Sequence, residues 1–303
     1  MRFPLKVLFL SGVTIFTLHA GRGSTTMHAI NEQPGYMRPL ATSIGTMTNS
    51  GWFQSASIDK EFGFGVALPI SLIYIGSKDR TYTDSYTDFT GTVNVAVPTI
   101  FGSEEKPLIP GTTFRAGLEE FRELSVIPYI TVQTSFSFYY TELKLRYMGM
   151  PTIKKNGFHF PGIGIQHDFH YLFPSLPVAI ALAGNMTFLN TSLTPGDKLD
   201  GTLKTGGIAG FLGIVAGYRP IDNLEIFLET GWDHSHVSVK GDIVSTEDNG
   251  WELIPVNNRI AGRNAFRAAL NIAVPIKYHP VAGVIAGAQW GNLINLISYK
   301  SRH

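Results

Sequence analysis

The chain has 303 residues, a formal net charge of +1, 16% charged residues, 32 glycines and no cysteine. The balance of charge argues against a nucleic-acid-binding protein, which would carry a basic patch or stripe. Without cysteine the chain forms no disulfide and has no lipid-carrying cysteine behind an export signal.

The N-terminus has the three parts of a secretory signal peptide. Arg2 and Lys6 give a positive first region, an apolar run covers Val7–Leu18, and the small residues Ala20 and Gly21 follow. The run is shorter than the ~20 residues that a membrane-spanning helix needs. We therefore expect residues 1–20 to be a cleaved signal peptide and the mature protein to be exported.

Residues 21–57 form a predicted N-terminal segment with one short helix. Leu40, Ile44 and Met47 recur at three- and four-residue spacing within Tyr36–Asn49, and the turn residues Ser50 and Gly51 follow. This segment is a candidate plug, and the residues expected to form its contact surface are Leu40, Ile44, Met47 and Trp52.

From Ile58 onward the apolar period changes to two, which predicts a β-domain over residues 58–303. The first strand is expected at Phe62–Leu68 and the second at Thr92–Val97, with a polar connection at Lys78–Asp88 between them. Ser103–Glu123 is predicted to be a long loop with one possible helical turn. Further strands are expected at Val126–Val132, Glu142–Tyr147, Gly157–Phe169, Leu176–Leu189, Gly206–Tyr218, Leu224–Asp233 and Arg263–Ile276.

Several of these strands have one apolar and one charged face. Leu224–Asp233 places Glu225, Glu229 and Asp233 on its polar face, and the polar face of the last strand carries Arg263 and Arg267. Glu142–Tyr147 likewise places its charged residues, Glu142, Lys144 and Arg146, on one side. A soluble sandwich turns such charges to water, whereas an outer-membrane barrel turns its apolar face to lipid and its charges to the lumen.

Loop lengths and aromatic residues favour the barrel. The connections Tyr171–Pro174, Arg219–Asn223 and Tyr278–Pro280 are predicted to be tight, and Thr191–Thr205 and Lys240–Asn258 to be long. Outer-membrane barrels alternate short and long connections in this way and carry aromatic girdles at strand ends. About 280 residues after the signal allow roughly 10–14 strands. In this arrangement Glu225, Glu229, Asp233, Arg263 and Arg267 form a charge ladder across neighbouring strands in the lumen.

Two clusters of polar residues are candidate chemical sites. His236 and Ser238 share a strand face and resemble a base and nucleophile pair, but no oxyanion donor can be assigned. His167 and His170 would need a turn to ligate one metal. We expect no enzyme activity, no cofactor and no metal. Glycines such as Gly164 are expected to permit curvature or the close approach of a plug.

The order of several short motifs resembles a family of predicted bacterial outer-membrane proteins of unknown function, found largely in the Bacteroidota. The motifs are Tyr36–Phe53, Phe62–Gly65, Pro98–Gly102, Thr141–Tyr147 and Gly162–Asp168. The resemblance implies a barrel with an N-terminal segment in or under it. A looser similarity is to the long-chain fatty-acid channels of the FadL type, although their Asn-Pro-Ala hatch signature is absent from Met27–Asn49.

The sequence therefore predicts an all-β protein, an antiparallel transmembrane β-barrel in the bacterial outer membrane, surrounded by lipid and plugged by a short helix. The predicted function is a channel or transporter for small solutes, hydrophobic ones included. The alternatives are a sealed structural barrel, an outer-membrane hydrolase and an exported soluble β-sandwich.

Overall fold

The computed structural model describes residues 30, 35–88, 91–102, 125–153, 156–194, 199–221, 224–245, 251–275, 283–289 and 293–296. In these residues the protein is all-β apart from one α-helix and two short 3-10 turns, and its strands form one 13-stranded antiparallel sheet and one two-stranded hairpin. The expected signal peptide, the loop at Ser103–Glu123 and the turn at Tyr278–Pro280 lie outside the described residues.

The helix and strands follow the chain in an up-and-down order. The helix is α3 (Arg38–Asn49), and the strands of the large sheet are β1 (Gly63–Ala67), β2 (Ile70–Tyr74), β5 (Val126–Ile130), β6 (Val132–Phe138), β7 (Thr141–Ile153), β8 (Asn156–Asp168), β9 (Val178–Leu193), β10 (Leu199–Gly201), β11 (Leu203–Ile221), β12 (Leu224–Ser245), β13 (Glu252–Pro275), β14 (Gly283–Gln289) and β15 (Leu293–Leu296). Consecutive strands pair from β6 to β9 and from β11 to β15, so most connections are hairpins.

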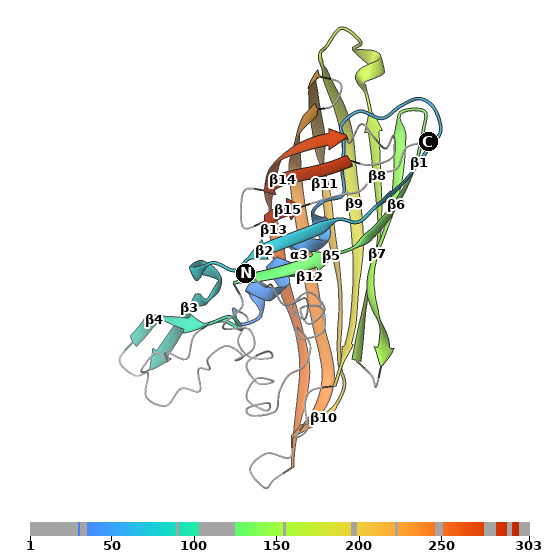
Figure 1. Cartoon of the computed structure of the whole chain (residues 1–303). Coiled ribbons are helices and arrows are strands. Elements are labelled where there is room, and N and C mark those ends of the chain that lie inside the picture. Colours follow the sequence, from blue (N-terminus) through green and yellow to red (C-terminus); the bar gives the residue numbers. More distant parts are fainter. Residues whose placement is uncertain are drawn as a thin grey trace, which may run out of the picture.

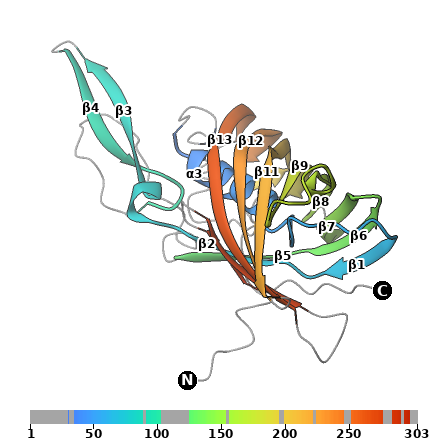
Figure 2. The same cartoon turned by 90° about the horizontal axis from the view of Figure 1, so that it is seen from above.

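The sheet curves around α3. Figure 2 shows β13, β12, β11, β9, β8, β7 and β6 passing in turn around the helix, and Figure 1 shows the helix beside the middle of the long strands. At the other end of the sheet β15 pairs with β2, so an element near the C-terminus lies beside one of the first strands.

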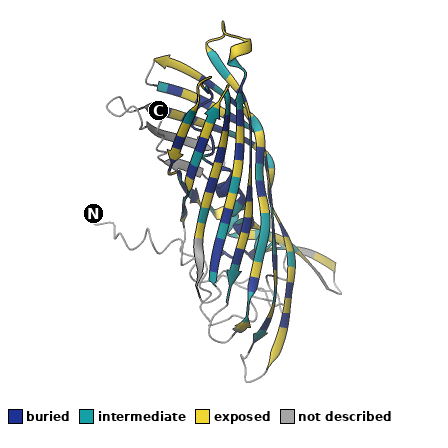
Figure 3. Cartoon of the chain, turned by 90° about the vertical axis from the view of Figure 1, so that its right-hand side faces the viewer, coloured by how far each residue is buried: buried dark blue, intermediate teal, exposed yellow. Residues whose placement is uncertain are grey.

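Burial alternates along every long strand, as Figure 3 shows by colour. Many exposed positions of the outer face are apolar: Leu212 is 64% exposed, Phe266 61% and Leu270 55%. The buried positions of the inner face include charged residues, since Lys144 is 0% exposed and Arg267 1%. The two-faced pattern of the sequence therefore corresponds to apolar residues outside and charges inside.

The inner face also holds an apolar cluster around α3. Leu40 and Met47 are buried there, and Ile44 is partly buried against the same cluster. Their partners come from the far ends of the long strands, including Val237 and Val256. The helix begins at Arg38, after Met37 and with Pro39 in its first turn, rather than at Tyr36 as predicted, because proline is preferred at this position.

The predicted long loops at Thr191–Thr205 and Lys240–Asn258 were wrong. β9 and β11 extend into the first of them, and β12 and β13 pair through most of the second, down to Ser245 opposite Glu252. Charged residues there, such as Lys240 and Asp242, lie on the outer face, while the inner face carries apolar residues such as Ile243 and Val256, which belong to the same cluster as the buried residues of α3. Polar composition had hidden the alternation.

The predicted polar connection at Lys78–Asp88 was also wrong. It contains a 3-10 turn, η1 (Ser77–Asp79), and a strand, β3 (Thr81–Asp88), which pairs with β4 (Gly91–Pro98). This hairpin lies outside the large sheet and projects from it (Figure 2). Its threonine and tyrosine residues favour strands whatever their polarity.

The second half of the first strand was not predicted. β2 follows β1 after Leu68 and Pro69, and β6 follows β5 after Thr131. Gly63 pairs with Ser137 and Tyr74 with Val126, in one unshifted register, and the Thr131 N–H donates to the Pro69 carbonyl at 3.0 Å. Because proline has no N–H, the backbone hydrogen bonds between the strands are interrupted here, but the strands continue in the same register.

Candidate functional site

A nine-residue segment after α3 crosses the inside of the curved sheet. We call this segment, Ser50–Ile58, the strap. Gly51 has a φ of 65°, a conformation that glycine adopts readily and that ends the helix. Trp52 and Ala56 are fully buried, and Phe53 is nearly so. The strap therefore fills the interior with its own side chains. Its backbone N–H and C=O groups must find hydrogen-bond partners on the inner face of the curved sheet, which we call the wall.

The C-terminal carbonyls of α3 all find partners. Two of them bond to Ser50 and one accepts the Trp52 indole N–H at 2.6 Å. The last, at Asn49, accepts from the Arg267 guanidinium at 2.7 Å. A positive charge at this end of a helix also interacts favourably with the helix dipole.

Arg146 binds the first carbonyls of the strap. Its guanidinium donates to the carbonyls of Ser50 at 2.6 Å and Gly51 at 2.5 Å, and to the side-chain oxygen of Gln133 at 2.7 and 3.0 Å. It also stacks on the Trp52 ring, 4.1 Å from its centroid. Within the described part of the chain no carboxylate forms an ion pair with Arg146.

Four of the five charges predicted to form a ladder lie together. Arg267 stands opposite Gly231, between Glu229 and Asp233, and its distances to their carboxylates are 2.8 Å and 3.8 Å. Arg263 reaches Asp233 at 3.0 Å. Diagonal neighbours on adjacent strands come close enough for such contacts, and glycine at the facing position leaves room for the guanidinium.

Glu225 lies outside this group. It pairs with Arg219 at 3.0 Å and accepts hydrogen bonds from the Ser55 hydroxyl and from the Ala56 N–H, both at 2.8 Å. Arg219 was predicted to be part of a tight turn and not a charge partner. The structure thus gives Glu225 a contact with the strap that period two alone does not reveal.

The far end of the strap is held by β8. Asp168 accepts the Ile58 N–H at 3.0 Å, and the Gln166 amide donates to the Ser55 carbonyl at 2.7 Å. Gln133, from β6, donates to the Trp52 carbonyl at 3.1 Å. These residues were not predicted as site residues, although Gln166 and Asp168 alternate with apolar residues in the sequence and so carried the same two-faced signal.

Lys144 occupies the inner face between these groups. It donates to Glu142 and, at 3.1 Å, to the side chain of Gln54 in the strap. Three neighbouring inward positions of β7 therefore carry Glu142, Lys144 and Arg146, all buried. Buried charges are tolerated only when they are paired and hydrogen-bonded, and here the strap provides part of the pairing.

Aromatic side chains of the strap pack against β8 and β11. Trp52 lies against Gly162 and Gly164 of β8, where an added Cβ would come within 2.9 Å and 2.8 Å of its ring. Phe53 packs against Phe211 at 6.0 Å between centroids. Gly162 and Gly164 therefore permit the close approach of the strap, as expected for glycines in this strand.

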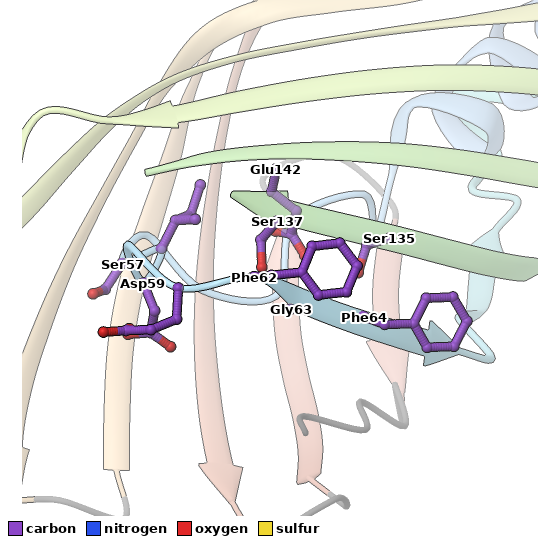
Figure 4. Close-up of a pocket in the computed structure, with 10 residues that line it drawn as sticks. Ser57, Asp59, Phe62, Gly63, Phe64, Ser135, Ser137 and Glu142 are labelled. Atoms are coloured by element: carbon purple, nitrogen blue, oxygen red, sulfur yellow. The ribbon is translucent and has the colours of Figure 1, made fainter. Parts of the chain in front are cut away.

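A small cavity opens where the strap leaves the interior. It has a volume of about 160 Å³ and lies between the strap end, β1 and the inner residues Ser135, Ser137 and Glu142 (Figure 4). The Phe62 and Phe64 side chains border it. The cavity adds polar space next to the strap.

The two other candidate clusters are not assembled as catalytic or metal sites in the described residues. Ser238 donates to the Gly206 carbonyl at 3.0 Å, and no hydrogen bond joins it to His236. His167 contacts the Thr141 hydroxyl at 2.8 Å, while His170 begins a separate 3-10 turn, η2 (His170–Leu172). No group of three or more potential metal ligands occurs in the part of the chain that is described.

The chain belongs to a family of unknown function, DUF6588, whose family model matches residues 26–251. No curated protein matches it. None of the helices in the described ranges has the length and apolarity to span a membrane.

Solved structures match only weakly. A triple mutant of the Rhodopseudomonas blastica porin is 8% identical, with 80% of this chain and 99% of that chain covered and a TM-score of 0.16. Pseudomonas aeruginosa OpdK, solved with vanillate, is 9% identical, with 82% and 100% covered and a TM-score of 0.12. Scores this low do not establish a common fold.

Replacing Gly164 by alanine should destabilise the protein. The new methyl group would meet the rigid Trp52 ring at 2.8 Å, and overpacking of this kind costs about 1–3 kcal/mol. Gly206→Ala is the matched control, because its methyl group would lie 3.7 Å from Ser238, an ordinary contact. Urea unfolding followed by tryptophan fluorescence measures both, and equal midpoints would show that Trp52 does not press on β8.

Proposed function

We propose that this protein is a bacterial outer-membrane β-barrel that acts as a gated channel for small solutes, with α3 and the strap as the gate. The observation that carries the proposal is the inside-out distribution of side chains. Leu270 is 55% exposed on the outer face while Arg267, three residues away, is 1% exposed on the inner face. Lipid outside and a polar interior explain this distribution, and water outside does not.

Strand pairing supports a closed barrel. β1 and β2 share one register with β6 and β5, and β10 continues β11 along β12 in the same register. Treating each such pair as one strand turns the 13-stranded sheet into a ring of ten strands, because β15 pairs with β2. Where β13 pairs with β14, over Ala269–Pro275, the ring leaves no sheet edge exposed to lipid, as a membrane requires.

The outer surface supports a bilayer-sized apolar band. On β12 the exposed residues are apolar from Ile226 to Trp232 and then change to His234 and Lys240. Trp232 donates its indole N–H to Asn264 at 2.8 Å, the polar contact expected where an aromatic girdle meets water. With 22 residues, β12 is about twice the ~9–11 that cross a bilayer, so part of it extends beyond the membrane.

The polar contacts of the strap support its role as a gate. Wall residues hold the strap backbone through hydrogen bonds that water or a solute can replace. Beside these bonds, Trp52, Phe53 and Ala56 pack in an apolar cluster with wall residues such as Phe211 and Phe227. A polar wall of this kind favours polar solutes over the hydrophobic ones that the fatty-acid channel resemblance implied. No enzymatic activity is proposed.

A sealed structural barrel is the second candidate. It is favoured by the completeness of the contacts between strap and wall, which hold Trp52 and Ala56 at 0% exposure. The two candidates differ in one respect, because a gate must open when its contacts are weakened and a structural plug need not.

If the outer face meets lipid, the loss of stability caused by a charged substitution there should depend on its position along the strand. Leu270→Arg should destabilise the folded protein in lipid vesicles by about 2–4 kcal/mol, because the site lies in the apolar band. Leu253→Arg, on the same outer face of β13 but roughly 55 Å further along the strand, should change stability by less than about 0.5 kcal/mol. Guanidinium unfolding in vesicles measures both, and a mild effect at both positions would indicate water outside.

If α3 and the strap form a gate, weakening their contacts should open the channel and a disulfide that fixes α3 should close it again. Arg146→Leu removes the donors to Ser50 and Gly51 and should produce channel openings in planar bilayers, whereas Arg259→Leu, on the exposed outer face, should not. Adding Gly45→Cys, Arg263→Cys and Ser235→Gly should close the channel again until a reductant is added. The two cysteine Cβ atoms would lie about 3.7 Å apart, within the range for a disulfide, and the glycine removes a clash.

The locking experiment also decides between the candidates. Openings that the disulfide abolishes and reduction restores support a gate. A silent Arg146→Leu barrel that still inserts into the bilayer would support the sealed structural barrel instead.

A further inference from the structure

The wall recognises the strap mainly through its backbone. Six wall side chains bind main-chain atoms at the end of α3 and along the strap: Arg267 at the Asn49 carbonyl, Arg146 at the Ser50 and Gly51 carbonyls, Gln133 at the Trp52 carbonyl, Gln166 at the Ser55 carbonyl, Glu225 at the Ala56 N–H and Asp168 at the Ile58 N–H. These contacts are made to backbone atoms, which every polypeptide has.

The side chains of the strap contribute less selectivity. Gly51, Ser55, Ala56 and Ser57 are small, and Trp52, Phe53, Gln54 and Ile58 are the larger buried side chains. A different sequence with small residues at the same positions could present the same carbonyl and N–H groups to the wall. The wall is thus matched to an extended peptide rather than to one sequence.

Two wall charges depend on the strap for their pairing. In the described residues Arg146 has no carboxylate partner and Asp168 no cationic one, and strap carbonyls and an N–H group take these places. When the strap withdraws, both charges lose these partners in a largely enclosed space, which is costly unless a ligand or water replaces them. A peptide supplies both kinds of partner at the right spacing.

We propose that the open interior binds short extended peptides, for which the strap is an internal mimic. The inference rests on the proposed gate and names the class of solute that the gate admits. The cavity of about 160 Å³ beside Ser57 and Ile58 gives such a peptide room for a larger side chain at one end (Figure 4).

The test measures displacement of the strap by added peptide in the full-length protein in detergent. Ser55→Cys introduces one thiol into a chain without cysteine, at a site that is buried while the strap is seated. A charged maleimide then reports strap withdrawal as a labelling rate. The background carries Gly164→Ala, which disturbs the seat of Trp52 and should raise the basal rate above that of Ser55→Cys alone.

Three blocked octapeptides are compared at equal concentration. The first has the sequence of residues 51–58. The second has the same composition in a shuffled order that keeps small residues at the positions of Gly51, Ser55, Ala56 and Ser57. The third is the first with N-methyl groups at the positions of Ala56 and Ile58. The first two should raise the labelling rate about tenfold, and the third should not, because it lacks the two N–H donors. Gln166→Leu should reduce the effect of both active peptides, whereas Asn190→Leu, on the outer face, should leave it unchanged.

The outcomes separate this inference from the proposed function. If the Gly164→Ala background does not raise the basal rate, the strap does not withdraw and the gate itself is refuted. If the basal rate rises but no peptide changes it, or the methylated peptide acts like the first, peptide binding is refuted while the gate stands. Activity of the first peptide without the shuffled one would also overturn the inference, because it shows recognition of the strap sequence alone.

Discussion

The need to pair buried polar groups governs how this protein is built. A sheet with an apolar outer face must turn its charged residues inward, where an unpaired charge is costly. The wall solves part of this problem by itself, through Arg267 with Glu229 and Lys144 with Glu142. The rest is solved by the strap, whose backbone partners Arg146 and Asp168. The buried charges of the wall and the backbone groups of the strap therefore depend on each other for their hydrogen-bond partners.

The sequence predicts the faces of the strands better than their lengths. Period two in Leu224–Asp233 identified the residues that point inward, because side-chain alternation is a local property of the chain. It missed the continuation of β12 to Ser245, since the polar outer residues there resemble a loop when the inner apolar ones are not considered separately. β3 was missed for the same reason, as polar threonine and tyrosine residues form strands without an apolar face.

The candidate site was predictable only in part. Lys144 and Arg146 were visible as the charged side of one strand, and Leu40 and Met47 as the contact surface of a helix. Which charge meets which partner depends on register, and register is set by strands far apart in sequence. Glu225 illustrates this limit, because its partners Arg219 and Ser55 come from a turn and from the strap, and no spacing within β12 indicates either.

The pairing of β15 with β2 also constrains how the molecule can assemble. Its hydrogen bonds join residues 293–296 to residues 70–73, so this part of the ladder forms only after almost the whole chain has been synthesised. Contacts of such long sequence separation form late, because the intervening chain must first be ordered. The strap precedes all of these strands and lies inside them. It is therefore most simply enclosed while the sheet is still open, and threading a finished wall would require the aromatic side chains of Trp52 and Phe53 to pass through a filled interior.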